Sequence, residues 1–564
     1  MRSDDRETGD AATGLSRTDD GMGEGAVLVP LGEHTPRPVE RRGALGHVDD
    51  VVRRALAERE RRSPEESRTW GKARRDEVPR SAHALLWGGA DPDAKDGGGA
   101  DPARPDPVDL IRSQDEARVE ELVPVRHERM ATSPFAFFRG GALVMASDLS
   151  RTPTTPIRVQ ACGDAHISNF GLFASPERRL VFDVNDFDET ARGPWEWDVK
   201  RLVTSVEVCA RDRGFSDDRA HDAALACAAA YHRAMDGFSR MGNLDVWYAH
   251  ADADSIAKLV EEHGSKKDRK ATREVLDRAR SKDSTRAVEK LTEVVDGQLR
   301  IVSDPPLVVP LRDFVRQRLE RTSDAGGAGR AAAPARVRAL SDVAGDIAER
   351  LGGTPEERAA DLIRLILHGY RKSLPDDRRA LFDSYRGVDV ARKVVGVGSV
   401  GTRAWICVFE GASPSDPLVL QVKEAQESVL ERFVGRSPFA EHGRRVVEGQ
   451  RAIQVASDVM LGWTRLPGDD GRIHDYYVRQ LWDGKGSVDL TRVSAGQLTR
   501  VGELCAWTLA HAHARTGDRF AIAGYLGASD AFDQAVAAYA HAYADLNERD
   551  YDEFVRARRE GRLS

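Results

Sequence analysis

Two carboxylates and an amide side chain lie close together between residues 162 and 188. Asp164 and Asn169 belong to a glycine-led segment, and Asp186 follows a short apolar run that predicts a buried strand ending in acids. Carboxylate and amide oxygens are hard ligands of the kind that Mg²⁺ prefers when it also holds phosphates. In kinases, one Asp accepts the substrate hydroxyl proton while an Asn and a second Asp hold the metal ions. We therefore expect Asp164 to be a general base, and Asn169 and Asp186 to be metal ligands.

The same stretch carries a resemblance. Gly-Asp-x-His-x-x-Asn at 163–169, followed by a strand that ends in Asp-Phe, is similar to the catalytic and metal loops of aminoglycoside-phosphotransferase-like kinases. We include His166, inside this motif, among the expected catalytic residues. The resemblance also matches Asp198, in the sequence GPWEWD, to an Asp that braces the catalytic loop. Without the resemblance, Asp198 stands where a helix N-cap would fall.

From about Asp106 onward the chain also resembles a bacterial family of unknown function, DUF2252. The matching segments are SPFAFFRG, GDAHISNFG, DFDE, GPWEWDVKRL, VVGVGSVGTR and YYVRQL. The resemblance names a family and implies no reaction. The chemistry must therefore come from the residues themselves.

A glycine-rich segment lies some 230 residues after the first motif. A dinucleotide-binding turn would require a helix directly after the glycines, but residues 404–410 are strand-like. This favours a hairpin that covers phosphates, with a plain glycine-rich hairpin as the alternative. Lys423 ends the next strand, where kinases place a phosphate-pairing Lys, and this strengthens the first interpretation. A solvated Lys at a strand end is the common alternative. The residues expected to contact the nucleotide in the hairpin are Gly396, Gly398, Ser399 and Gly401.

Two further parts of a nucleotide site are predicted from this Lys. A kinase-type Lys needs a Glu on a helix to hold it, and we expect Glu448 in that role, with Glu427 as the alternative. The strand-like sequence DYYVRQLW occupies the position of the segment that receives the adenine. We expect backbone groups around Gln480 to Trp482, including those of Gln480 and Leu481, to make that contact.

Three other features have ordinary explanations that we favour. Phe135, Phe137 and Phe138 around Arg139 predict a wedge in the core, although such an Arg can also contact a phosphate or a catalytic carboxylate. The basic run at 264–282 predicts a solvated helix face, with an anion-attracting surface as the alternative. His511 and His513 lie two apart, so a helix turns them to different faces, which favours packing or capping over metal binding.

Composition limits the classes of function. The chain has 564 residues, of which 40% are hydrophobic and 31% charged, and no apolar run is long enough to cross a membrane. A net charge of −8 argues against a general nucleic-acid binder. The N-terminus lacks the apolar core of a secretory signal, so we expect a cytoplasmic protein without membrane partners. The five scattered cysteines predict reduced, packed thiols.

The sequence predicts an α+β protein with a two-lobed, kinase-like fold. Because the catalytic motif precedes the glycines and Lys423, opposite to the order in kinases, we expect a circular permutation. The predicted parts are a disordered tail and linker at 1–105 with one short helix near 51–61, a helical lobe with the catalytic and metal loops at 106–387, a sheet-rich nucleotide-binding lobe at 388–484, and helices that complete the helical lobe at 485–564. Within the helical lobe, the sequence at 323–336 predicts a flexible insertion.

The expected function is that of a phosphotransferase that uses ATP and Mg²⁺ and acts on a small-molecule or protein hydroxyl. A nucleotide-binding regulatory module without turnover is the first alternative, but it would be expected to lose Asp164 or Asp186. Transfer of AMP to a protein by the same fold is the second, and it needs the same metal ligands with the nucleotide reversed. A magnesium-dependent hydrolase would leave Lys423 without a role.

Overall fold

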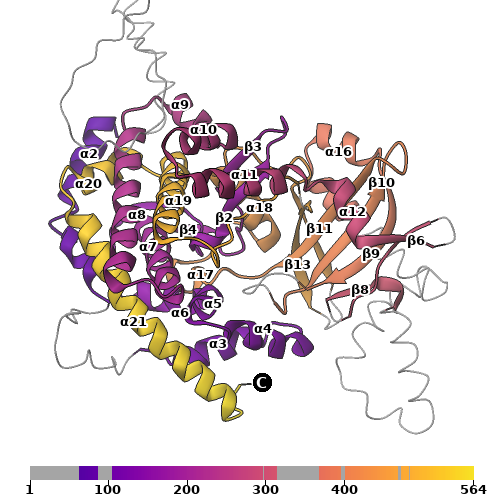
Figure 1. Ribbon diagram of the computed structural model, residues 1–564, viewed down its shortest axis with the longest axis horizontal. Coiled ribbons are helices and arrows are strands. Elements are labelled where there is room, and N and C mark those ends of the chain that lie inside the picture. Colours follow the sequence, from indigo (N-terminus) through magenta and orange to yellow (C-terminus); the bar gives the residue numbers. More distant parts are fainter. Residues whose placement is uncertain are drawn as a thin grey trace, which may run out of the picture. The chain divides into compact units, whose positions relative to one another are not determined.

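The computed structural model has a mixed α+β fold with small antiparallel sheets and a larger helical part (Figure 1). The residues it describes all belong to one compact unit, Arg62–Ser564. None of the described helices is both long and apolar enough to span a membrane. The described residues are 62–86, 104–295, 298–305, 307–313, 367–394, 400–467, 472–481 and 483–563.

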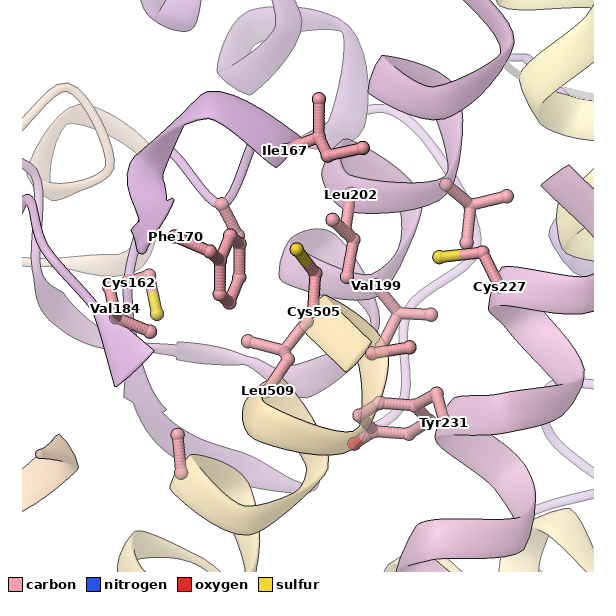
Figure 2. Packing of buried hydrophobic residues seen from close by; sticks show 14 of the residues in the cluster. Cys162, Ile167, Phe170, Val184, Val199, Leu202, Cys227, Tyr231, Cys505 and Leu509 are labelled. Carbon is pink, nitrogen blue, oxygen red and sulfur yellow. The ribbon is translucent and has the colours of Figure 1, made fainter. Parts of the chain in front are cut away.

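Long helices from two distant parts of the chain pack into one core. α7 (Trp195–Asp212) and α8 (Asp217–Phe238) contact α19 (Ala495–Thr516), and α21 (Ala531–Arg559) packs across both α7 and α8. Because α8 and α19 carry many alanines on their buried faces, they pack closely. Figure 2 shows the side chains of α19 between those of α7 and of the strands that precede it.

Shorter helices and strands surround this core. All five cysteines are buried and unpaired, and Cys227 and Cys505 pack there as small apolar groups. The shorter helices are α3 (Pro107–Asp115), α4 (Val123–Met130), α5 (Pro134–Gly140), α6 (Ala142–Leu149), α9 (Asn243–Tyr248), α10 (Ala253–His263), α11 (Lys266–Arg280), α12 (Ser284–Leu291) and α20 (Arg519–Leu526), with 3₁₀ turns at Glu120–Leu122 and Ile167–Asn169.

An antiparallel sheet of six strands lies in the order β12-β13-β11-β10-β9-β8. Its central strand, β11 (Pro417–Ala425), is buried along nearly its whole length, since it pairs with a strand on each side and helix α18 (His442–Ile453) contacts it. The other elements of this region are β8 (Val308–Pro310), β9 (Arg386–Lys393), β10 (Ala404–Glu410), β12 (Gly462–Pro467), β13 (Ile473–Gln480), α16 (Asp376–Phe382) and α17 (Glu431–Val434).

Small sheets hold the first polar motif. β1 (Arg158–Ala161) pairs with β4 (Ala191–Pro194), and β2 (Phe170–Ala174) pairs with β3 (Leu180–Val184), which also pairs with β5 (Ala251–Asp252). The predicted strand that ends just before Asp186 is therefore present as β3. A separate hairpin joins β6 (Thr292–Val295) to β7 (Gln298–Ile301).

Part of the expected N-terminal tail is ordered. Helix α2 (Pro64–Ala73) begins with a capping box made by Ser63 and Glu66, and a 3₁₀ turn follows at Arg80–Ala84. α2 packs against α20 so closely that a Cβ on Gly71 would lie 2.0 Å from the carbonyl oxygen of Ala521. The predicted disorder therefore does not extend through these residues, because they find a partner in the C-terminal helices. The helix expected near residues 51–61 and the insertion expected at 323–336 lie outside the described residues.

Candidate functional site

Asp198 holds the turn that leads into the first motif. Its carboxylate accepts hydrogen bonds from the backbone N–H groups of Cys162 (2.6 Å) and Gly163 (2.9 Å), and His513 Nε2 lies 3.2 Å away. Gly163 has φ +82°, and a Cβ there would lie 2.1 Å from the Glu189 carbonyl oxygen, so only glycine fits this turn. The N-cap alternative is wrong, because Pro194 caps α7 and Asp198 lies one turn inside it.

Asp164 is held by one arginine on one of its two oxygens. Arg201 Nε and Nη2 donate to Asp164 Oδ1 at 2.9 and 2.8 Å, while Oδ2 accepts no hydrogen bond from the described residues and lies 3.6 Å from His166 Nε2. Burial raises the pKa of the Asp164 carboxyl, and Arg201 opposes that rise. Burial lowers the pKa of His166 well below its usual value, so this imidazole is neutral at pH 7. The arrangement leaves Asp164 Oδ2 available to take a proton.

A backbone hydrogen bond joins Asn169 to Asn185, the residue that precedes Asp186. Asn169 Nδ2 donates to the carbonyl oxygen of Asp164 at 2.9 Å, and the Asn169 carbonyl accepts from Asn185 N–H at 2.8 Å. The side-chain oxygen of Asn169 has no partner in the described residues, and Asp186 Oδ1 is buried without a hydrogen bond. Within the described residues, no group of three or more His, Cys, Asp or Glu side chains is arranged to hold a metal ion. An amide oxygen and one carboxylate instead suit Mg²⁺ that is also held by phosphates.

Lys423 reaches these residues from the central strand of the six-stranded sheet. It forms an ion pair with Asp188, and its Nζ lies 3.8 Å from Asp186 Oδ1, although Asp188 and Lys423 are 235 positions apart in sequence. Tyr477, opposite Lys423 on β13, donates its hydroxyl to Asp188 Oδ1 at 2.8 Å. Burial lowers the pKa of Lys423, but Asp186 and Asp188 outweigh it and raise the pKa above its usual value. Burial raises the pKa of Asp186, but the charges of Lys423 and Arg479 outweigh it and lower the pKa below its usual value.

Glu448 does not contact Lys423. Its Oε1 lies 3.4 Å from Arg451 Nη1, and the cavity beside Lys423 is lined by Gln450 of α18 and by Gln454, which directly follows the helix. Two positions along an α-helix differ by about 200° around its axis, so Glu448 and Gln450 point in opposite directions. The acid that forms an ion pair with Lys423 is instead Asp188, two positions after Asp186.

A cavity of about 380 Å³ lies beside Lys423 and Asp186. Lys282, Arg479 and Lys485 line it, and within the described residues none of the three has a carboxylate within 4 Å. The Arg479 charge, and then burial, lower the pKa of Lys485 to about 7. An excess of unneutralised cations indicates an anionic ligand. The complete lining is Phe173, Ala174, Asn185, Asp186, Lys282, Lys393, Gln421, Lys423, Gln450, Gln454, Asp458, Arg479, Gln480, Leu481, Asp483, Lys485 and Ser487.

Of the backbone groups expected to contact adenine, the N–H groups of Gln480 and Leu481 already have partners within the protein, and Trp482 lies outside the described residues. Gln480 N–H donates to Asp458 Oδ2 at 2.5 Å, and Leu481 N–H donates to the Val419 carbonyl at 2.8 Å. Both residues line the cavity, but neither N–H is available for a ligand. The sequence did not indicate Asp458 as the acceptor for Gln480 N–H, because this residue lies in a loop after α18.

Of the predicted glycine hairpin, the structure describes only Gly401. It has φ +92° and its carbonyl accepts from Val119 N–H at 2.8 Å, but it does not line the cavity. Gly396, Gly398 and Ser399 lie outside the described residues.

Several cationic side chains at this site were missed or given another explanation. Arg201 lies one turn after Asp198 in the sequence WDVKRL, a spacing that could have indicated it. Lys282 ends the basic run that we interpreted as a solvated face, and α11 within that run is mostly exposed, as expected. Arg479 and Lys485 flank the predicted adenine contact, but charge alone does not distinguish a lining residue from a solvated one. The remaining predicted histidine, His511, packs with Nε2 2.8 Å from the Val246 carbonyl oxygen.

Comparison with known proteins places the chain in a family. No curated protein and no solved structure matches it. One family model matches residues 118–557, which span most of the chain and include every predicted site residue. The chain therefore belongs to the DUF2252 family, described as an uncharacterized protein conserved in bacteria.

Proposed function

We propose that the protein is an ATP- and Mg²⁺-dependent phosphotransferase that acts on a hydroxyl group. One observation carries this proposal: Lys423 of the six-stranded sheet lies 3.8 Å from Asp186 at a cavity that is also lined by Lys282, Arg479 and Lys485, for which the described residues supply no carboxylate within 4 Å. A magnesium nucleoside triphosphate needs an acid for the metal and cations for the phosphates, and phosphoryl transfer depends mainly on positioning and charge neutralisation. A cavity of about 380 Å³ falls within the range of ligand pockets.

The residues around Asp186 fit a magnesium ion. Asp186 Oδ1 is a buried oxygen that makes no hydrogen bond with the described residues, although Lys423 Nζ lies 3.8 Å away. The side-chain oxygen of Asn169 makes no hydrogen bond in the described residues either. When bound, Mg²⁺ would neutralise the charge of the phosphate oxygens. Asp186 and Asn169 would hold it, and Lys423 would exchange part of its contact with Asp188 for a phosphate oxygen.

Asp164 is the general base of the proposed reaction. The acceptor hydroxyl oxygen forms the new bond to the terminal phosphorus, its proton passes to Asp164 Oδ2, and the bond to the ADP oxygen breaks. Arg201 keeps the carboxylate in place through Oδ1, so that Oδ2 faces the reactants with its lone pairs free. Asp198 fixes the turn that carries this loop.

The proposed fold is a circularly permuted, kinase-like one. Its support is the order of the parts: the loop with Asp164 and Asp186 precedes the sheet with Lys423 in the chain, while helices from before residue 240 and after residue 494 share one core. On this view the six-stranded sheet is the small lobe, and the shared helical core is the large one.

ATP with Mg²⁺ should raise the melting temperature of the protein. A ligand at a hundred times its Kd stabilises the folded state by about 2.7 kcal/mol. Asp186→Asn should remove most of the Mg²⁺-dependent part of that rise, because it weakens the metal ligand while its volume is unchanged. Differential scanning fluorimetry measures the effect, with Asp377→Asn, an exposed acid on α16, as the control. If calorimetry finds no binding of any nucleoside triphosphate to the wild-type protein, the proposed function is wrong.

Nucleotide binding should take up a proton near neutral pH. Lys485 has a pKa of about 7 because Arg479 lies close and burial adds to its effect; Asp186 opposes them, and Lys423 and Lys282 also face it. The negative charge of a bound triphosphate would raise the pKa of Lys485. Above pH 7 the Lys485 amine of the free protein is neutral and must take up a proton when the nucleotide binds. The affinity for the nucleotide should therefore fall as the pH rises from 7 to 9. Calorimetry in buffers of different ionisation enthalpy measures the uptake. Lys485→Met should abolish the uptake, and uptake that persists in this variant would assign the proton to another group.

Transfer of AMP is a second candidate, favoured by one observation. The N–H groups of Gln480 and Leu481 are already used within the protein, and Arg479 and Lys485 place cations close to them. If the phosphates lie at the end of the cavity near Gln480 and Leu481, the nucleotide is bound in the direction opposite to that in kinases, where this end receives the adenine. Incubation with ATP labelled on the γ- or the α-phosphate distinguishes the two reactions: γ-label on the acceptor supports phosphotransfer, and α-label supports AMP transfer.

A further inference from the structure

Arg139 is a cation without a partner beside the predicted base. It lies in the last turn of α5, partly buried, and its Nε is buried without a hydrogen bond. Within the described residues its guanidinium makes no hydrogen bond and no ion pair. The phenylalanines around it, Phe135, Phe137 and Phe138, are buried as the core wedge that we expected. Arg139 itself makes none of the polar contacts that a purely structural arginine would make.

The backbone places Arg139 next to Asp164. Arg201 Nη2 donates both to the carbonyl oxygen of Phe138 and to Asp164 Oδ1, each at 2.8 Å. The guanidinium of Arg201 therefore links the predicted base to Phe138, the residue before Arg139. Burial lowers the pKa of Arg139, and Asp164 and then Asp186 are the strongest charges that oppose it. Arg201 already neutralises Asp164, which makes a second cation at this point unnecessary for the folded state alone.

An unpaired, partly buried cation costs free energy that folding must offset. The guanidinium fork binds carboxylate and phosphate groups through two parallel hydrogen bonds. A ligand that pairs with Arg139 would therefore carry an oxyanion, such as a carboxylate or a phosphate. Arginine remains charged at pH 7 even when burial lowers its pKa, so the charge is available for such a ligand.

An anion bound by Arg139 would lie outside the cavity proposed to hold the nucleotide. Asp186 and Lys423 line the large cavity, whereas neither Asp164 nor Arg139 does. Asp164 is recessed, with its side chain 19% exposed, which suits a small molecule better than a protein surface. On the proposed function, the group that approaches Asp164 is the acceptor.

We propose that Arg139 binds an oxyanion of the acceptor, and that the acceptor is therefore a small hydroxyl compound carrying a phosphate or a carboxylate. This inference rests on the proposed function, since it needs an acceptor at Asp164. The fork of Arg139 would hold the anionic group while the hydroxyl lies against Asp164 Oδ2. Such an anchor contributes by fixing the reacting oxygen in place.

The first test uses inorganic phosphate as the probe. The full chain is saturated with Mg²⁺ and the imido analogue of ATP to fill the large cavity, and phosphate is then titrated by calorimetry. We expect one further site with a Kd near 1 mM, weakened about tenfold or more in Arg139→Gln and less in Arg139→Lys. Arg112→Gln, an exposed arginine on α3, is the matched control and should bind as the wild type does. Absence of this site in the wild type, or an unchanged Kd in Arg139→Gln, overturns the inference.

The second test separates the inference from the proposed function. With γ-labelled ATP and a panel of sugar phosphates, hydroxy acids and uncharged sugars, we expect label only on the anionic compounds. Label only on uncharged compounds would overturn the inference and leave the phosphotransferase proposal intact, whereas failure to bind nucleotide would refute that proposal. The melting temperature of Arg139→Gln should change little, because the described residues make no hydrogen bond or ion pair with the guanidinium; a fall of several degrees would show that Arg139 serves the fold instead.

Discussion

Replacement of Asp164 with asparagine should lower turnover by about a hundredfold or more and leave nucleotide affinity nearly unchanged. The variant keeps the shape of the side chain and can still accept a hydrogen bond from Arg201, but its amide cannot take the proton of the acceptor hydroxyl. Affinity should be retained because Asp164 does not line the cavity that Lys423 and Asp186 share. Single-turnover transfer from γ-labelled ATP and calorimetry with the imido analogue measure the two quantities.

The control for this prediction is Asp254→Asn, an exposed acid on α10, which should leave both quantities unchanged. Asp164 also lies in a buried network, so its replacement needs a stability measurement as well. Full turnover in Asp164→Asn together with early unfolding would show that the carboxylate braces Arg201 and is not the base.

Replacement of Asp198 with alanine should lower the free energy of unfolding by about 3 kcal/mol or more. The carboxylate accepts hydrogen bonds from Cys162 N–H and Gly163 N–H and lies 3.2 Å from His513 Nε2, and it is almost fully buried. Its removal leaves these buried groups without an acceptor, and each unsatisfied group costs about 1–3 kcal/mol. Activity should fall too, since the turn at Gly163 carries the loop with Asp164.

Urea denaturation measures this change, with the linear dependence of unfolding free energy on denaturant giving the value in water. Asp198→Asn is the matched variant: it keeps one acceptor oxygen and should lose less stability than Asp198→Ala. An Asp198→Ala protein as stable as the wild type would contradict the bracing role assigned to this carboxylate.

Features that depend on neighbouring residues could be predicted from the sequence. The apolar run before Asp186 forms β3, and the run before Lys423 forms β11, because alternation and length are local properties of a strand. The DUF2252 segments could be recognised for the same reason, since each is a short continuous motif. The coarse α+β class followed from the helical pattern on both sides of a strand-rich region.

Features that depend on which side of an element faces another could not be predicted in the same way. Glu448 was expected to hold Lys423, but α18 turns Gln450 toward the cavity and Glu448 away from it. Backbone groups of Gln480 and Leu481 were expected to contact the adenine, but their N–H groups already donate to Asp458 and to the Val419 carbonyl. The rotation of a helix and the partners of a backbone group are set by tertiary packing.

The sequence by itself determined the family and the polar groups of the loop at 163–169, because their spacing fixes which residues a tight turn can bring together. Only the tertiary structure decided that Asp188 forms the ion pair with Lys423, that Arg201 holds one oxygen of Asp164, and that the buried Nε of Arg139 makes no hydrogen bond with the described residues. These contacts could not be predicted because the residues that make them lie far apart in the sequence. An interaction across 235 positions depends on how the sheet and the helices pack, and no local pattern records that packing.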